Sequence, residues 1–252
     1  MSGPVTYLIT GAGRGIGHGF ASKLLRRPST IVIAAVRNVD AASPALKALP
    51  VAEGSRLIVV KLDSTKQSDA ETAVTELQER HGLSKVDVVV ANAGIYTENA
   101  SILDTSLQSM RNHFEVNAIA PVILLRALKV LLQKSNAPLF VGISSYVGSI
   151  GGQKDVIEFG NIASPYGASK AALNWFVHRL HLEEHWLTAF TFNPGLVSTD
   201  MGKGFTGGVD PVHFGGSTVE DSVNNMLTVM DEASREKVGG KFLQYNGTEL
   251  PF

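Results

Sequence analysis

The sequence of 252 residues contains no cysteine. This absence excludes disulfide bonds, thiolate metal ligands and cysteine nucleophiles, so the chain must fold without covalent cross-links. A folded chain of this length buries roughly 70–75% of the surface that its unfolded form exposes, which makes cross-links unnecessary. The absence also fits a reducing compartment, and we expect a cytoplasmic protein.

An excess of charge of one sign is missing as well. The 22 basic and 23 acidic residues give a net charge of −1, and no run rich in lysine or arginine occurs. This balance argues against a general nucleic-acid or membrane surface, so we expect neither as a partner. No apolar run reaches the roughly 18 residues that span a bilayer. Residues 1–10 also lack the basic and apolar segments of a secretory signal.

Short β-branched runs alternate with helix-like stretches along the whole chain. Strands are predicted at residues 5–9, 31–36, 57–60, 86–91, 139–143, 188–192 and 241–245. Helices are predicted at residues 15–27, 66–79, 106–133, 166–184 and 219–232. Such alternation joins parallel strands through right-handed crossovers. The sequence therefore predicts an α/β fold, a doubly wound parallel sheet of about seven strands with helices on both faces.

No linker rich in proline, glycine or serine divides the chain, and no internal repeat is found. We therefore expect one domain over residues 1–252. Two polar, glycine-containing segments interrupt the alternation, at residues 151–164 and 202–217. Both are interpreted as loops of that domain, and the second is expected to be mobile.

A glycine-rich segment directly follows the first predicted strand and opens the first predicted helix. Its residues are Thr10, Gly11, Ala12, Gly13, Arg14, Gly15, Ile16 and Gly17. Glycines allow the backbone to turn tightly and to approach a pyrophosphate, which then lies at the positive end of the helix. The alternative is an ordinary turn. The strand–turn–helix context favours a dinucleotide site, with Gly11, Arg14, Gly15, Ile16 and Gly17 at the cofactor.

The residues after the second predicted strand indicate which dinucleotide binds. An NAD site has an acidic residue there for the ribose 2′-hydroxyl, whereas this chain has Arg37 and Asn38. Together with Arg14, these residues suit a 2′-phosphate, which two guanidinium groups bind through charge-assisted bonds. The alternatives are two solvated surface arginines, or NAD bound through Asp40. The sequence favours NADPH/NADP⁺.

Tyr166 and Lys170 lie one helical turn apart on the same face of a predicted helix. A tyrosine with a pKa near 10 is a poor acid–base catalyst at neutral pH, and a nearby ammonium lowers that pKa. Ser145 follows the strand at residues 139–143, at the edge of the sheet where ligands bind, and its hydroxyl can hold a carbonyl oxygen. The alternative is a buried tyrosine and a lysine that share a helix by chance.

These motifs occur in one order along the chain, which resembles the short-chain dehydrogenase/reductase family over essentially its whole length. The resemblance rests on five segments: residues 10–17, Asn92-Ala93-Gly94, Asn117, Tyr166 with Lys170, and Pro194-Gly195 followed by Val197 and Thr199. It implies a single-domain Rossmann fold and an enzyme that reduces a small-molecule carbonyl compound. Two further stretches, residues 166–175 and 245–252, look similar to fungal norsolorinic acid-type ketoreductases, and carbonyl reductases of the sniffer and C-factor kind look related.

The resemblance also implies a role for each matching residue. Tyr166 is the general acid, Ser145 holds the carbonyl, and Lys170 lowers the pKa of the tyrosine and binds the nicotinamide ribose. Asn117 helps to hold a water that links Lys170 to solvent. The residues expected around the rest of the cofactor are Asp63, Asn92, Gly94, Pro194, Val197 and Thr199. A homodimer or homotetramer is expected as well.

One departure from the family pattern concerns the distance between the serine and the tyrosine. Ser145 and Tyr166 are 21 positions apart, whereas many members of the family have about a dozen. The extra residues fall at 151–164, where they include Phe159, and they predict a loop beside the substrate. A bulky or aromatic, polyketide-like substrate is expected from the narrower resemblance.

Other interpretations remain open at this point. His178, His181 and His185 recur at helical spacing, but without further ligands they indicate a solvated helix face, and we expect no metal. A second possibility is that the protein is a non-catalytic NADP-binding sensor or scaffold, because the fold alone does not determine function. A third possibility is an NADP-dependent alcohol dehydrogenase that works mainly in the oxidative direction.

Overall fold

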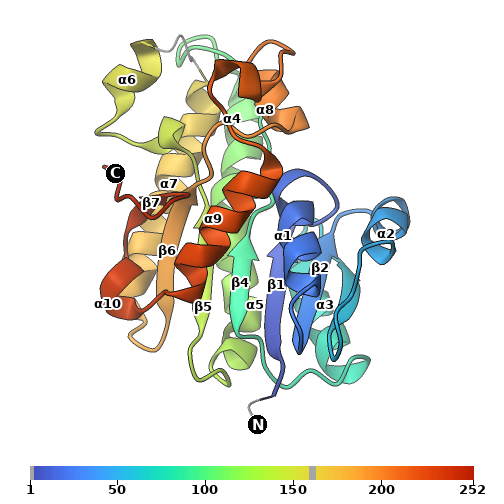
Figure 1. The fold of residues 1–252 in the computed structure, drawn as a ribbon. Coiled ribbons are helices and arrows are strands. Elements are labelled where there is room, and N and C mark those ends of the chain that lie inside the picture. The colour runs from blue at the N-terminus through green and yellow to red at the C-terminus, as the bar shows by residue number, and fades with distance from the viewer. Residues whose placement is uncertain (1–2, 159–162) are drawn as a thin grey trace. The chain divides into compact units, whose positions relative to one another are not determined.

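A computed structural model describes residues 3–158 and 163–252. Seven strands form one sheet in the order β3-β2-β1-β4-β5-β6-β7 (Figure 1). They are β1 (Val5–Thr10), β2 (Thr30–Val36), β3 (Arg56–Lys61), β4 (Val88–Ala91), β5 (Leu139–Ile143), β6 (Thr188–Asn193) and β7 (Phe242–Gln244). The pairs β1–β2, β2–β3, β1–β4 and β6–β7 are parallel. The predicted fold class is confirmed.

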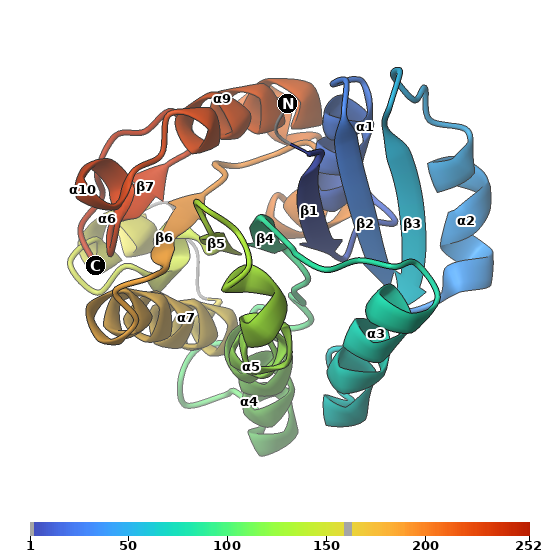
Figure 2. The same ribbon diagram turned by 90° about the horizontal axis from the view of Figure 1, so that it is seen from below.

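The chain divides into two compact units, and the boundary in β5 falls between Val141 and Gly142. The first unit holds residues 1–93 and 122–141. Its helices are α1 (Gly15–Leu25), α2 (Val39–Lys47), α3 (Gln67–Glu79) and most of α5 (Ala120–Leu132). Helices α1 and α3 cover opposite faces of β1–β3 (Figure 2). All seven residues of β2 are buried, which is why that strand is uniformly apolar apart from its first residue.

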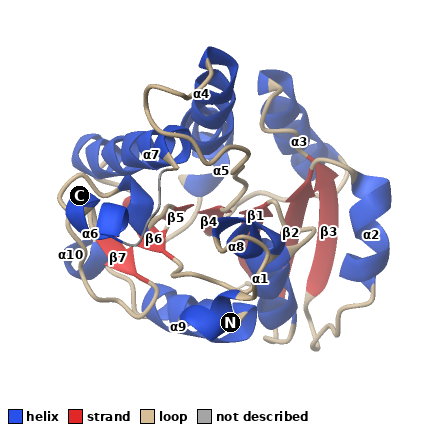
Figure 3. Cartoon of the chain, turned by 90° about the horizontal axis from the view of Figure 1, so that it is seen from above, coloured by secondary structure: helices blue, strands red, loops and turns tan. Residues whose placement is uncertain are grey.

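The second unit holds residues 94–121 and 142–252. Its longest helix, α7 (Ser164–Glu183), covers one face of β6 and β7, and α9 (Val219–Asp231) covers the other (Figure 3). The other helices are α4 (Leu107–Phe114), α6 (Gln153–Glu158), α8 (Asp200–Phe205), α10 (Arg235–Val238), the π-helical turn η1 (Glu115–Ile119) and the 3₁₀ turns η2 (Tyr146–Gly148) and η3 (Pro211–Phe214). Phe190 and Phe192 of β6 and Phe242 of β7 are completely buried in this unit.

Three expectations need correction. The helix predicted at residues 106–133 is interrupted by η1, because five residues there adopt the wider π-helical turn. The segment at 151–164 is not wholly a loop, since α6 forms within it; Phe159 lies outside the described residues. The segment at 202–217 contains the end of α8 and all of η3, while its mobility stays a prediction.

No helix within the described ranges is long and apolar enough to cross a membrane. The prediction of one catalytic domain over residues 1–252 stays a prediction.

Candidate active site

The glycine-rich segment of the first unit forms a tight turn between β1 and α1. Gly11 and Gly15 have φ values of 65° and 55°, a region that favours glycine. A Cβ on Gly17 would lie 2.5 Å from the Gly11 carbonyl oxygen and 2.6 Å from Nδ2 of Asn92. Helix α1 begins after Arg14, which makes no side-chain cap, and its first turn has no acidic residue. These main-chain N–H groups and the glycine cradle fit a cofactor pyrophosphate.

Asn92 braces this turn from the end of β4. Its Nδ2 donates a hydrogen bond to the Thr10 carbonyl oxygen at 2.8 Å. The Thr10 hydroxyl oxygen in turn accepts from the main-chain N–H groups of Asn92 and Ala93, at 3.0 and 2.9 Å. The sequence predicted Asn92 as a residue at the cofactor. The geometry gives it a structural task as well, which is to fix the shape of the glycine turn.

Arg14 and Arg37 both have exposed side chains in the first unit. Partial burial raises the pKa of Asp63, but hydrogen bonds from Thr65 and the positive charge of Arg37 outweigh it, so the pKa of this carboxyl is lowered. Arg37 and Asp63 therefore lie close enough to interact, as expected for residues that follow the paired strands β2 and β3. The Asn38 side chain caps α2 by accepting from Ala41 N–H at 3.0 Å.

The predicted catalytic side chains of the second unit come together around Tyr166. Tyr166 is the third residue of α7 and is 5% exposed; Lys170 is 3% exposed. The Ser145 hydroxyl forms a hydrogen bond with the Tyr166 side chain. Lys170 Nζ lies 5.6 Å from the centre of the Tyr166 ring and donates to the Ile143 carbonyl oxygen at 2.6 Å. Ser144, by contrast, is turned toward the Lys170 carbonyl oxygen, 3.4 Å away.

Burial dominates the acid–base properties of this group. It raises the pKa of Tyr166 to about 12, although the hydrogen bond with Ser145 acts in the opposite direction. Burial also lowers the pKa of Lys170 to about 7. Desolvation is the largest cause of the raised pKa of Tyr166 in the protein without its cofactor, and a lowering of that pKa by Lys170 stays a prediction. At neutral pH the phenol is protonated, which is the form that a general acid requires.

The buried Lys170 predicts a pH-dependent stability. Its pKa falls from 10.5 in the unfolded chain to about 7 in the folded protein. As pH rises from about 7 toward 10, the unfolded state therefore holds more protons than the folded one, and the free energy of unfolding rises. We expect Lys170→Met to remove this rise, up to about 1.4 kcal/mol per pH unit. Urea unfolding of the cofactor-free protein between about pH 7 and 9.5 measures it.

Lys154→Met, at an exposed position on α6, is the matched control and is expected to keep the wild-type slope. If the Lys170→Met variant kept the slope too, another group would be the source of it.

Asn117 lies in the π-helical turn and is fully buried. Its Oδ1 accepts from Ile95 N–H at 2.8 Å, and its Nδ2 donates to the Ile95 carbonyl oxygen and to Ser169 Oγ, both at 3.0 Å. Ser169 Oγ in turn donates to the Tyr166 carbonyl oxygen at 2.7 Å. The side chain of Asn117 therefore ties the segment after β4 to α7.

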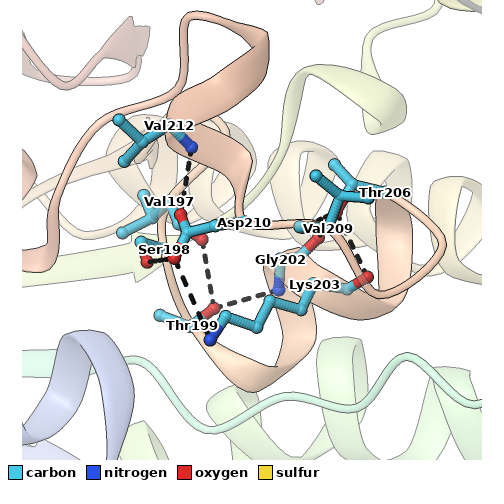
Figure 4. A network of polar contacts seen from close by, with 9 residues as sticks. All are labelled: Val197, Ser198, Thr199, Gly202, Lys203, Thr206, Val209, Asp210 and Val212. Atoms are coloured by element: carbon cyan, nitrogen blue, oxygen red, sulfur yellow. Dashed lines mark hydrogen bonds and ion pairs between the residues drawn. The ribbon is translucent and has the colours of Figure 1, made fainter.

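The segment after β6 carries the remaining predicted cofactor residues. The Pro194 carbonyl oxygen accepts from Ser222 Oγ at 2.7 Å, and Val197 forms a parallel bridge with Ser217. The Thr199 hydroxyl caps α8 by accepting from Gly202 N–H at 3.0 Å (Figure 4). Val197 and Thr199 are therefore held in defined positions, as contacts to a carboxamide require. Gly94 is half-buried at the start of the second unit.

Helix α6 is tied to the residues that follow Ser145. The Tyr146 hydroxyl donates to Asp155 at 2.6 Å, and Nε2 of Gln153 donates to the carbonyl oxygens of Val147 and Ser149. Ser149 Oγ also donates to the Pro251 carbonyl oxygen at 2.7 Å. The described part of the insertion is therefore anchored next to the predicted carbonyl-binding serine.

Three side chains near Tyr166 were missed by the sequence analysis. The rings of Tyr96, Phe205 and His113 lie 5.7, 5.4 and 6.4 Å from the Tyr166 ring, measured between centres. Tyr96 was within reach of sequence reasoning, because it follows the carboxyl end of β4, where ligands bind in such sheets. No pattern in the sequence pointed to Phe205 or His113, since they lie on two other helices, α8 and α4.

The three histidines at helical spacing make other contacts. His178 Nδ1 bonds with the Gly240 carbonyl oxygen at 2.7 Å, and Arg235 donates to the main-chain oxygen of His181. Among residues 3–158 and 163–252, no group of three or more His, Cys, Asp and Glu side chains is arranged to hold a metal ion.

Comparison with known proteins identifies the family. A profile of the short chain dehydrogenases matches residues 6–208. The norsolorinic acid ketoreductase of Aspergillus parasiticus is 42% identical over 253 residues, covering 98% of this chain and 90% of that protein. A short-chain dehydrogenase of Pyricularia oryzae is 40% identical over 254 residues, covering 100% of each.

Solved structures agree with this assignment. The NADPH-bound carbonyl reductase from chicken fatty liver is 29% identical with a TM-score of 0.86, covering 100% of this chain and 96% of that one. The carbonyl reductase Sniffer of D. melanogaster, at 23% identity, shares the fold with a TM-score of 0.83, covering 99% of this chain and 100% of that one. The chain belongs to the short-chain dehydrogenase family and is an oxidoreductase with a nicotinamide cofactor.

Proposed function

We propose that the protein uses NADPH to reduce a ketone or aldehyde to an alcohol, on a bulky or aromatic substrate. The observation that carries this proposal is the buried, protonated Tyr166, hydrogen-bonded to Ser145 and next to Lys170. The name of the 42% identical relative, a norsolorinic acid ketoreductase, supports a large aromatic ketone as the substrate class.

When bound, the nicotinamide cofactor supplies the hydride that adds to the carbonyl carbon. Tyr166 donates its phenolic proton to the carbonyl oxygen as that oxygen gains negative charge. The Ser145 hydroxyl donates a second hydrogen bond to the same oxygen and so stabilises the developing charge. Lys170 stabilises the tyrosinate that remains, and Asn117 holds the water through which solvent returns the proton.

NADPH is proposed because Arg14, in the glycine turn, and Arg37, directly after β2, are both exposed and are the residues expected to bind a 2′-phosphate. The NADPH-bound carbonyl reductase at 29% identity supports the same choice. The alternative was NAD bound through Asp40. This residue lies in the first turn of α2, where its negative charge interacts favourably with the helix dipole.

Two alternatives have less support. An oxidative direction would use Tyr166 as a base, and the name of the 42% identical relative, a ketoreductase, supports the reductive direction. A non-catalytic sensor would not require a buried lysine, Lys170, beside a tyrosine, Tyr166, that is hydrogen-bonded to Ser145.

A homodimer or homotetramer is also proposed. It would cover Trp175 of α7 and Leu107 of α4, which are 62% and 65% exposed.

A panel of carbonyl compounds tests the proposed function. The purified protein is mixed with aliphatic and aromatic ketones and aldehydes, with NADPH or NADH in excess, and the absorbance of the reduced cofactor is followed. We expect consumption of NADPH with aromatic ketones and at least tenfold slower consumption of NADH, as expected when a charge-assisted contact is lost. Oxidation of NADPH by no member of the panel would contradict the proposal.

A further inference from the structure

Three aromatic rings of the second unit meet at Tyr166, and we call Tyr96, Phe205 and Tyr166 the three-ring cluster. Tyr96 and Phe205 are stacked, with ring centres 3.9 Å apart and planes inclined by 13°. Both present edges to Tyr166, at interplanar angles of 78° and 69°. The stacked pair therefore stands beside the phenol that we propose as the proton donor, about one ring diameter away.

The cluster differs from an ordinary core contact in its exposure. Phe190 and Phe192 of β6 also pack edge to face, at 5.0 Å, and both are completely buried. Tyr96 and Phe205 are only half-buried, although Tyr166 itself is buried. Tyr96 and Phe205 therefore each keep some exposed surface, which the completely buried pair in β6 does not.

Tyr96 is held in position from both sides along the chain. The preceding residue, Ile95, is bonded through its N–H and its carbonyl oxygen to the Asn117 amide. The following residue, Thr97, donates its N–H to Nε2 of His113 at 3.4 Å, and the buried His113 ring is fixed by a 2.8 Å bond between Nδ1 and the Ser109 carbonyl oxygen. The ring is thus preorganised, which reduces the entropy lost on binding.

A network of polar contacts surrounds α8, the helix that ends at Phe205 (Figure 4). Asp210 accepts from Ser198 Oγ at 2.8 Å and from Val212 N–H at 3.1 Å, and it pairs with Lys203 at 3.9 Å. Thr206, next to Phe205, shares its main-chain N–H between the carbonyl oxygens of Gly202 and Lys203, both at 3.2 Å, and its hydroxyl donates to the Val209 carbonyl oxygen. Contacts within residues 198–212 therefore fix the segment that carries Phe205, and none of them involves the Phe205 ring.

We infer that the stacked pair Tyr96–Phe205 is the wall against which an aromatic ring of the substrate packs, and that Phe205 determines specificity for ketones whose carbonyl group adjoins such a ring. Rings prefer offset-stacked or edge-to-face contacts with centres 4.5–7 Å apart. Under this proposal, a ring attached to the carbonyl carbon lies within that range of the stacked pair, whose ring centres are 5.7 and 5.4 Å from that of Tyr166. This inference rests on the proposed function and assigns its substrate class to particular residues.

A matched pair of ketones tests the inference. 1-Tetralone and 1-decalone, called tetralone and decalone below, have the same bicyclic carbon skeleton. Only in tetralone is the carbonyl carbon attached to an aromatic ring. Phe205→Leu keeps apolar volume and removes the ring. We expect this variant to lower kcat/KM for tetralone about three- to tenfold, mainly through KM, as a lost aromatic pair predicts. For decalone we expect a change of less than about twofold.

The control is Phe214→Leu, which removes an exposed ring from η3 in the same segment and is expected to leave both ketones unaffected. Equal losses for the two ketones in Phe205→Leu would overturn the inference, since Phe205 would then only hold the segment in place. No loss for either ketone would overturn it as well.

Binding separates this inference from the proposed function. The affinity of the protein with NADP⁺ for tetralone is measured by calorimetry in the wild type and in Phe205→Leu. If the wild type reduced no member of the carbonyl panel, the proposed reduction would be refuted, yet weaker binding of tetralone by the variant would still support the packing of the substrate ring on Tyr96 and Phe205. Equal affinities would contradict it.

Discussion

Replacement of Tyr166 by phenylalanine is expected to lower kcat for carbonyl reduction by about 10²–10⁴-fold, the usual contribution of a general acid. The hydroxyl is the proton donor in the proposed reaction, and the substitution removes it without removing the buried ring. Because the ring still packs against Tyr96 and Phe205, the fold should survive. Steady-state rates with NADPH and a ketone found active in the panel measure the loss.

The dissociation constant for NADPH, measured by fluorescence, is the control for this variant and should change little. Solvent water is a far weaker acid than the positioned phenol, so little activity should remain. Retention of more than about a tenth of the wild-type kcat would show that a different group protonates the substrate.

Arg37→Asp is expected to raise the KM for NADPH about ten- to a hundredfold and to narrow or invert the preference over NADH. Charge-assisted bonds contribute roughly 1.5–3 kcal/mol each, and the new carboxylate repels a 2′-phosphate. The same carboxylate can accept a bond from the 2′-hydroxyl of NADH. The ratio of kcat/KM for the two cofactors, at one fixed ketone concentration, measures the effect.

Arg26→Asp makes the same change of charge at an exposed position just beyond the other end of α1, about 16 Å along the helix from the glycine turn. It should leave the cofactor ratio unchanged, which separates a local contact from the overall charge. A wild type that uses NADH and NADPH equally well would contradict the assignment of Arg37.

Most strands could be predicted from the sequence because parallel strands buried on both faces are short, continuous apolar runs. The strand predicted at 139–143 has the same bounds in the structure. The strand predicted at 31–36 begins one residue earlier, at Thr30. Helix α2 was not predicted, because Pro44 lies within it and lacks the N–H of an α-helical bond. The helix forms nevertheless, with Asn38 as its cap and Leu46 buried.

The π-helical turn around Asn117 could not be predicted for a different reason. The apolar spacing through residues 106–133 is that of one continuous helix. In the structure, Asn117 within this turn bonds to Ile95 and Ser169, which are 22 and 52 positions away along the chain. The sequence around Asn117 does not specify partners that are so far away along the chain.

The described part of the insertion shows the same limit. Polar and apolar residues mix at 151–158, so the sequence indicated a loop. Helix α6 forms where Asp155 reaches Tyr146 and Gln153 reaches the main chain of η2, contacts that only the folded chain brings about.

The sequence by itself determined the fold class, the family and the candidate catalytic residues Ser145, Tyr166 and Lys170. These depend on local spacing: strand and helix periods, a glycine turn, and two side chains one helical turn apart. Tertiary structure alone decided that burial, and not the neighbouring ammonium, governs the pKa of Tyr166 in the cofactor-free protein. It also decided that Tyr96 and Phe205 meet beside that phenol. Desolvation and ring contacts depend on which distant segments are packed together, and a linear pattern does not specify that packing.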